Sequence, residues 1–290
     1  MKKIAFLALL LCCATRFSYA QDLKAFQIYD KNQNPVNFPK MAEALSKYDI
    51  VLFGEYHDNA IVHWLELKTT QALFQLKGTQ LILGAEMFER DNQEAVNQYL
   101  SGETDDKKLA EDARLWANYK TDYKPLLDFA KENKLAFIAT NVPRRYASVV
   151  AKNGIDSLNR LPEDEKKFMA KLPIKIDMET PGYQGMFEMM KDHAAGKEMD
   201  FVAAQAIKDA TMAESILKNY KKKDLFLHYN GDYHSKEYGG IYWHLKNKKK
   251  RLKIAVISIV QSDSMDLPIP KDFVNTEFII VVPNDMTKTF

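Results

Sequence analysis

The sequence predicts an α/β protein whose mostly parallel sheet is flanked by helices. Short apolar runs without an internal polar residue, such as Ile50–Phe53, are typical of strands buried on both faces. These runs alternate with longer stretches of helical periodicity, which indicates βαβ units with right-handed crossovers. Apolar content is 46% and charged content 28%, as expected for a globular protein with a sizeable core.

The first twenty residues have the pattern of a secretory signal peptide. Two lysines precede an apolar stretch at Ile4–Ala14, and Ser18-Tyr19-Ala20 forms a small-x-small cleavage site. The apolar stretch is too short to span a membrane. We therefore expect residues 1–20 to be removed and residues 21–290 to form a single domain. The predicted location is the periplasm or the cell envelope, with association to the outer membrane left open.

Both cysteines, Cys12 and Cys13, lie within this leader. After cleavage the chain has none, which excludes disulfides, thiol nucleophiles and cysteine metal ligands. A lipoprotein anchor is the alternative, although Leu11 stands before Cys12 where a small residue is wanted. Cleavage also removes three positive charges, so the net charge changes from +2 to −1 and gives no indication of nucleic-acid binding.

Strands and helices are predicted in alternation along the mature chain. The strands are apolar runs, expected at Ile50–Phe53, Thr79–Phe88, Leu135–Thr140, Asp224–Tyr229, Leu252–Val260 and Glu277–Val282. Helical spacing of apolar residues predicts helices over Phe38–Tyr48, Asn59–Leu76, Asp91–Leu100, Asp106–Tyr119, Lys124–Glu132 and Asp200–Tyr220. Of these, Asn59–Leu76 is apolar nearly all round, so we expect it to be well buried.

Polar side chains follow the ends of four predicted strands. They are Glu55, His57, Glu86, Asn141, Arg144 and His234. The carboxyl ends of parallel strands lie at one edge of a sheet, where ligands usually bind. We therefore predict a catalytic cleft made by Glu55, His57, Glu86, Arg144 and His234. The alternative is that some of these residues only cap helices and tie loops together.

Imidazoles and carboxylates in one cleft suit two kinds of chemistry. They can bind a divalent metal, for which Glu55, His57 and His234 are the predicted ligands, or they can act as general acids and bases. A further carboxylate, Asp209, falls in the apolar face of the predicted helix Asp200–Tyr220. It needs a partner there, and Arg144 or Arg145 is the expected one.

Five short motifs occur in order along the chain. They are Gly54–Asn59 with His63, Glu86–Arg90, Asn141–Arg144, Ala204–Asp209 with Met212-Ala213, and Gly231–His234 with Gly239-Gly240. This series resembles the ChaN-like haem-binding family, within the Tiki and erythromycin-esterase-like group, from about Asp49 to Val260. The resemblance implies an exported bacterial protein of iron and haem acquisition, with haem bound by a tyrosine at a homodimer interface. It also suggests a haem-uptake partner at the outer membrane, and the wider group implies a Glu and His cleft.

A methionine-rich stretch is the predicted haem site. Residues 154–199 read as a helical insertion, and Lys166–Met199 holds six of the twelve methionines. On a helix from Tyr183 to Ala194, one side would present Tyr183, Met186, Phe187, Met190 and His193. Methionines suit a flat apolar ligand, and Tyr or His can ligate iron. We predict that Tyr183 is the iron ligand and that Met186, Met190 and His193 contact haem. Tyr146, Tyr233 and Tyr242 remain open as ligands, and a plain helix core is the alternative.

Two functions are therefore open. One is an exported haem-binding protein of iron acquisition. The other is a metal-dependent hydrolase that uses the strand-end cleft, with Glu55 or Glu86 as general base. Whether the chain is an enzyme stays undecided. The sequence has no phosphate-binding glycine loop and no Ser-His-Asp order, so nucleotide chemistry and serine hydrolysis are not supported.

Overall fold

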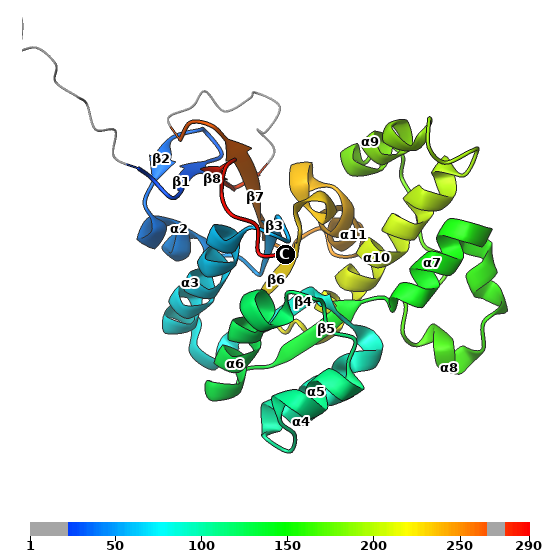
Figure 1. Ribbon diagram of the computed structural model, residues 1–290, viewed down its shortest axis with the longest axis horizontal. Helices are drawn as coiled ribbons and strands as arrows, with labels where there is room; N and C mark the ends of the chain where they lie inside the picture. The colour runs from blue at the N-terminus through cyan, green and yellow to red at the C-terminus, as the bar shows by residue number, and fades with distance from the viewer. Residues whose placement is uncertain (1–22, 266–275) are drawn as a thin grey trace, which may run out of the picture.

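The structure, a computed structural model, describes residues 23–265 and 276–290. The predicted leader at residues 1–20, with Cys12 and Cys13, lies outside the described residues. One sheet runs through the molecule, with helices on both of its faces (Figure 1). Its strands are β1 (Gln27–Asp30), β2 (Pro35–Val36), β3 (Ile50–Glu55), β4 (Leu81–Glu89), β5 (Phe137–Asn141), β6 (Leu225–Gly231), β7 (Ile254–Ser262) and β8 (Phe278–Pro283).

The strands lie in the order β2-β1-β8-β7-β3-β6-β4-β5. The six strands from β8 to β5 are parallel to their neighbours, whereas β1 pairs antiparallel with both β8 and β2. The predicted fold class is confirmed, and all six predicted strands are present. The two strands that were not predicted, β1 and β2, have only four and two residues, too few to show a pattern.

The helices of the described part cover the sheet in two groups. They are α2 (Phe38–Leu45), α3 (Ala60–Lys77), α4 (Gln93–Ser101), α5 (Asp106–Asp112), α6 (Lys124–Glu132), α7 (Arg144–Asn153), α8 (Glu163–Lys166), α9 (Pro181–Met190), α10 (Glu198–Asn219) and α11 (Gly240–Lys248). The larger core lies between the sheet and the first group, α2 to α6, and a smaller one lies under α10 and α11. No helix among the described residues is long and apolar enough to cross a bilayer.

Helix α3 is less buried than its apolar pattern predicted. Trp64 is 49% exposed and packs on the Phe26 ring. The interior side instead carries polar groups, among them His63 and Glu66, which are 5% and 0% exposed. A helix with apolar residues all round leaves its orientation undecided, and here the polar partners decide it.

The helix predicted over Asp106–Tyr119 is also shorter than expected. Helix α5 ends at Asp112, and the chain makes a π-helical turn at Tyr119–Tyr123 before α6 begins. Such turns often occur at functional sites. This one brings Asn118, Asp122 and Tyr123 against the end of β3.

The predicted helical insertion packs outside the sheet. It contains α8 and α9 and contacts α7 and α10 through a separate apolar cluster. Helix α9 ends at Met190, four residues before the predicted end. It lies on α10 mainly through Tyr183, which contacts Val202 and Ala206.

Candidate functional site

The carboxyl ends of four adjacent strands, β3, β6, β4 and β5, form one side of a cavity of about 740 Å³. All five residues of the predicted catalytic cleft line it: Glu55, His57, Glu86, Arg144 and His234. They come from parts of the chain up to about 180 residues apart, and adjacency in the parallel sheet brings them together. Whether they are catalytic remains a prediction.

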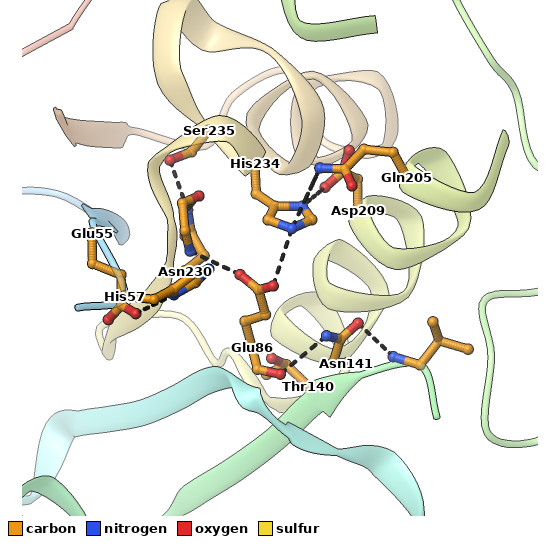
Figure 2. A network of polar contacts seen from close by, with 12 residues as sticks. Glu55, His57, Glu86, Thr140, Asn141, Gln205, Asp209, Asn230, His234 and Ser235 are labelled. Atoms are coloured by element: carbon orange, nitrogen blue, oxygen red, sulfur yellow. Dashed lines mark hydrogen bonds and ion pairs between the residues drawn. The ribbon is translucent and has the colours of Figure 1, made fainter. Parts of the chain in front are cut away.

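Glu86 and His234 form the buried centre of the cavity wall (Figure 2). His234 Nε2 lies 3.1 Å from Glu86 Oε1, and His234 Nδ1 bonds Asp209. The second oxygen of Glu86 accepts a 2.8 Å hydrogen bond from the Gly231 backbone N–H. The register of β4 shifts between Ala85 and Glu89, an irregularity of the kind that redirects a side chain. Glu86 therefore points across the end of β6 instead of into a packed layer.

The charges of this centre are strongly coupled. Burial alone would lower the pKa of His234, but Glu86 and Asp209 more than offset it and raise that pKa to about 10. Burial alone would raise the pKa of Glu86, but the charge of the facing His234 outweighs burial and holds this pKa far below its ordinary value. At neutral pH the centre is thus an imidazolium between two carboxylates.

Asp209 has a different partner from the one predicted. Its oxygens accept hydrogen bonds from His234 and from the Tyr183 hydroxyl, the latter at 2.9 Å. Arg145 pairs instead with Asp91 on the other side of α7. The expectation of an arginine partner was wrong because helical periodicity shows that Asp209 is buried but not which residues lie opposite it, and these are His234 after β6 and Tyr183 on α9.

His57 and Glu55 form a second pair at the mouth of the cavity. His57 Nδ1 lies 2.6 Å from Glu55 Oε1, which also accepts a 2.8 Å hydrogen bond from the Tyr123 hydroxyl. Burial would lower the pKa of His57, but the bond to Glu55 and the charge of Glu86 raise it. Nε2 of His57 lies so close to Gly231 that a Cβ there would come within 2.8 Å of it. Only glycine at 231 leaves room for this ring.

The remaining polar lining contains three basic residues beside the carboxylates of Glu89 and Asp232. Arg144, Lys208 and Lys236 all line the cavity, and the side chain of Arg144 is exposed. The backbone N–H of Arg144 donates to Glu89, a 3.0 Å bond that ties the start of α7 to the end of β4. The cavity thus combines a buried ionic centre with a cationic rim.

The predicted metal ligands do not form one group. Glu55, His57 and His234 line the same cavity, but both nitrogens of His234 are engaged by Glu86 and Asp209. Among the described residues, the group that does bring three ligand atoms within 4.8 Å of one another is Glu55, His63 and Glu66. Only Glu55 is common to both sets.

The predicted haem residues are divided between the cavity and other places. Met186 lines the cavity, Met190 is half-buried beside it in α9 without being part of the lining, and His193 is exposed beyond the helix end. Tyr183 is 1% exposed, and its hydroxyl is engaged by Asp209 and by His244 Nε2 at 3.2 Å. The Tyr183 side chain lies between α9, to which it belongs, and α10, and it is not part of the cavity lining.

Of the four tyrosines considered as iron ligands, Tyr233 is the one that lines the cavity, and the half-buried Tyr56 lines it as well. Its side chain is 39% exposed, and the added Cβ of an alanine at Gly185 would lie 3.2 Å from its hydroxyl. Lys236 stands 4.4 Å from its ring centroid, a cation–π contact. Met189 also lines the cavity and is 59% exposed, which helical periodicity within α9 did not predict. Tyr233 directly precedes His234, so its position after a strand was the signal available in the sequence.

Comparisons with known proteins agree with this architecture. The family model described as haem-binding uptake, Tiki superfamily, ChaN matches residues 41–245. A solved structure of cofacial haem binding to ChaN of Campylobacter jejuni is similar over 90% of this chain and 98% of that chain, with 19% identity and a TM-score of 0.67. The two share the fold.

Two other solved structures are less similar. A Bacillus cereus protein is 13% identical over 86% of this chain and 98% of its own, with a TM-score of 0.47. A mutant of the erythromycin esterase EreC in an open conformation is 12% identical over 90% and 83%, with a TM-score of 0.48. No curated protein matches the chain.

Proposed function

This chain belongs to the ChaN family of haem-binding uptake proteins in the Tiki superfamily, as its five motifs predicted, and from this we propose that it binds haem in the strand-end cavity. The observation that carries the proposal is the half-exposed Tyr233, which stands in the cavity wall beside Met186 and Met189. A phenol oxygen is an established ligand of haem iron. Methionine side chains adapt to the face of a flat apolar ligand.

The cavity also suits the charged edge of haem. The two propionates are carboxylates, and Arg144, Lys208 and Lys236 supply cations along the cavity lining. Trp116, which packs edge-on against His57 at 4.8 Å, adds an aromatic surface. When bound, haem supplies an iron centre whose exchange or transport would be the protein's task.

We propose Tyr233, not Tyr183, as the iron ligand. For Tyr183 to reach iron, its hydroxyl would have to leave Asp209 and its ring would have to leave Val202 and Ala206. Either loss leaves buried groups without partners. Tyr233 needs no such rearrangement because its ring already lies at the surface of the cavity.

Haemin titration of four purified proteins tests this proposal. The wild type should give a shifted Soret band at a defined stoichiometry, Tyr183→Phe should keep that shift, and Tyr233→Phe should lose it. Tyr242→Phe, a half-buried tyrosine outside the cavity lining, is the matched control. A Soret shift that survives in Tyr233→Phe and disappears in Tyr183→Phe would reverse the assignment, and no shift in the wild type would end the haem proposal.

The cellular part of the proposal is that the protein is exported and takes part in iron or haem acquisition. The leader at residues 1–20 supports export, and the family's uptake role supports acquisition. A homodimer that shares haem, and a haem-uptake partner at the outer membrane, belong to the same proposal. Cell fractionation with and without residues 1–20, and size-exclusion with light scattering with and without haemin, test these points.

A second candidate function, hydrolysis at the same cavity, rests on the bond between His57 and Glu55. A carboxylate that holds one imidazole nitrogen leaves the other to act on water as a general base. Here Nδ1 bonds Glu55, and Nε2 lies beside Gly231 at the cavity wall. We expect wild-type turnover of a small ester to fall at least a hundredfold in His57→Ala. Equal turnover in the two proteins would exclude this role for His57.

A further inference from the structure

A second polar centre lies behind His57, between β3 and α3. It consists of Glu55 at the end of β3, and His63 and Glu66 one turn apart on α3. These side chains are 2%, 5% and 0% exposed. Positions three apart share one face of a helix, so His63 and Glu66 both face Glu55. Neither His63 nor Glu66 is part of the cavity lining.

The imidazole of His63 is held in one orientation. Nε2 lies 3.1 Å from the backbone carbonyl of His57 and 3.4 Å from Asp122 Oδ2, so this nitrogen carries the proton and donates it. Nδ1 is then directed at the two glutamates, 3.1 Å from Glu66 Oε2 and 3.8 Å from Glu55 Oε2. A carboxylate or carbonyl behind the far nitrogen is the usual support of a metal-binding histidine.

Two carboxylate oxygens of this centre have no N–H or hydroxyl donor. Glu55 Oε2 and Glu66 Oε1 are both fully enclosed, and the contact left to these two carboxyl groups is the one that they make with each other. The other oxygen of Glu55 is satisfied by Tyr123 and His57. A buried carboxylate oxygen without a donor is costly, and a cation bound by Glu55 Oε2 and the Glu66 carboxylate would neutralise both groups and remove that cost.

We propose that Glu55, His63 and Glu66 bind one divalent first-row cation, for which Zn²⁺ is the probe. Ligand atoms around a tetrahedral zinc lie about 3.3 Å apart, given metal–ligand bonds of about 2.0 Å. The 3.1 and 3.8 Å separations from His63 Nδ1 bracket that value. One nitrogen and two carboxylate donors suit Zn²⁺ or Mn²⁺, whereas Ca²⁺ needs six to eight oxygen ligands.

The site has a clear relation to the cavity. Glu55 belongs to both, because Oε1 holds His57 and Oε2 faces His63. A cation on Oε2 would fix the Glu55 carboxylate and, through it, the ring of His57. The entry route is the cavity itself, where His57 is the half-exposed side chain in front of Glu55.

Metal analysis of the full mature chain tests this proposal. After stripping with chelator and dialysis, the wild type should take up one Zn²⁺ per chain by calorimetry and elemental analysis. Co²⁺ in its place should give the visible absorption of a low-coordinate site. Glu66→Gln keeps the shape of the side chain and removes its charge, so we expect Zn²⁺ affinity to fall at least tenfold. Glu89→Gln, a cavity carboxylate outside the group, is the matched control and should bind as the wild type does.

Each other outcome overturns the proposal. Zn²⁺ uptake that survives in Glu66→Gln but is lost in His57→Ala would place the cation in the cavity. No stoichiometric uptake by the wild type would mean that a proton shared between the glutamates occupies this centre. Circular dichroism of every variant separates loss of the site from loss of the fold. The Soret titration of Tyr233→Phe is read on separate samples, so the haem and metal proposals fail independently.

Discussion

Replacement of Asp209 by asparagine tests the buried ionic centre most directly. Asparagine has the same shape, and its oxygen can still accept from the Tyr183 hydroxyl. Its amide, however, presents N–H donors to His234 Nδ1, where the carboxylate accepts a hydrogen bond from the imidazolium. The imidazolium of His234 then retains only Glu86, at 3.1 Å, as a charged partner. We expect His234 to lose its proton at a lower pH in Asp209→Asn.

The magnitude follows from the two ends of the titration. The pKa of His234 rises from an ordinary 6.5 to about 10, and each pH unit is worth about 1.4 kcal/mol, so the charged ring contributes at most about 5 kcal/mol. This contribution is complete below pH 6.5 and is lost as the pH rises toward 10. With one of two carboxylates removed, we expect the free energy of unfolding to fall by about 3 kcal/mol at pH 6. The difference should shrink as the pH approaches 10.

Urea unfolding at pH 6 and pH 9.5, with NMR titration of the His234 ring, gives both quantities. His63, which also titrates near pH 10, is present in both proteins, so its contribution cancels in the difference. Asp200→Asn, in the first turn of the same helix, should cost less than about 1 kcal/mol at either pH. An equal loss at both pH values, or a wild-type His234 that titrates near 6.5, would refute the ionic centre.

Two further substitutions test the packing around the strand ends. Burial raises the pKa of Asp232 to about 6, so the free energy of unfolding of the wild type falls as the pH rises from 3.8 through 6. We expect Asp232→Asn to be more stable than the wild type by about 2 kcal/mol at pH 7.5 but not at pH 4. A pH-independent difference in urea midpoints would contradict this. Gly54→Ala would place a Cβ 2.9 Å from the Ile257 carbonyl of β7 and should lower the free energy of unfolding by about 1–3 kcal/mol. In the control Gly182→Ala the added Cβ makes only an ordinary contact at 3.5 Å, so the free energy of unfolding should not fall. Equal midpoints for the two alanine variants would show that β3 and β7 yield at this point.

The sheet could be predicted because its strands are apolar on both faces, a local property of each run. What no local pattern contains is the order of the strands. β6 lies between β3 and β4, although some 135 residues separate it from the nearer of them in the chain. The end of α5 was misplaced for a related reason, since residues 113–119 fit a continued helix and only the contacts of Asn118 and Tyr123 with His57 and Glu55 reveal the turn.

Site residues could be predicted where their position after a strand was enough. They could not be predicted where the orientation of one helix against another decides which side chains line the cavity. The position of Glu55, His57, Glu86 and His234 near the ends of predicted strands was enough to predict that they meet in one cavity, without knowledge of the strand order. Helical periodicity, by contrast, gives a face but not its neighbour. It placed Tyr183 and Met186 on one broad side of α9, but Tyr183 packs on α10 and only Met186 lines the cavity. Tyr233 also follows a strand, but the methionine pattern of the insertion led to the prediction of Tyr183 as the iron ligand.

The placement of β3 has a consequence for how the chain folds. Both neighbours of this strand, β6 and β7, are synthesised more than 160 residues after it. By contrast, β4 and β5 can pair with each other before β6 is synthesised. Until Leu225 has emerged, β3 has no strand to pair with among those described, and its apolar side chains stay exposed to other chains. A nascent chain of this protein would thus need a holdase until about its last quarter arrives, and fragments that stop short of β6 should aggregate instead of forming half a sheet.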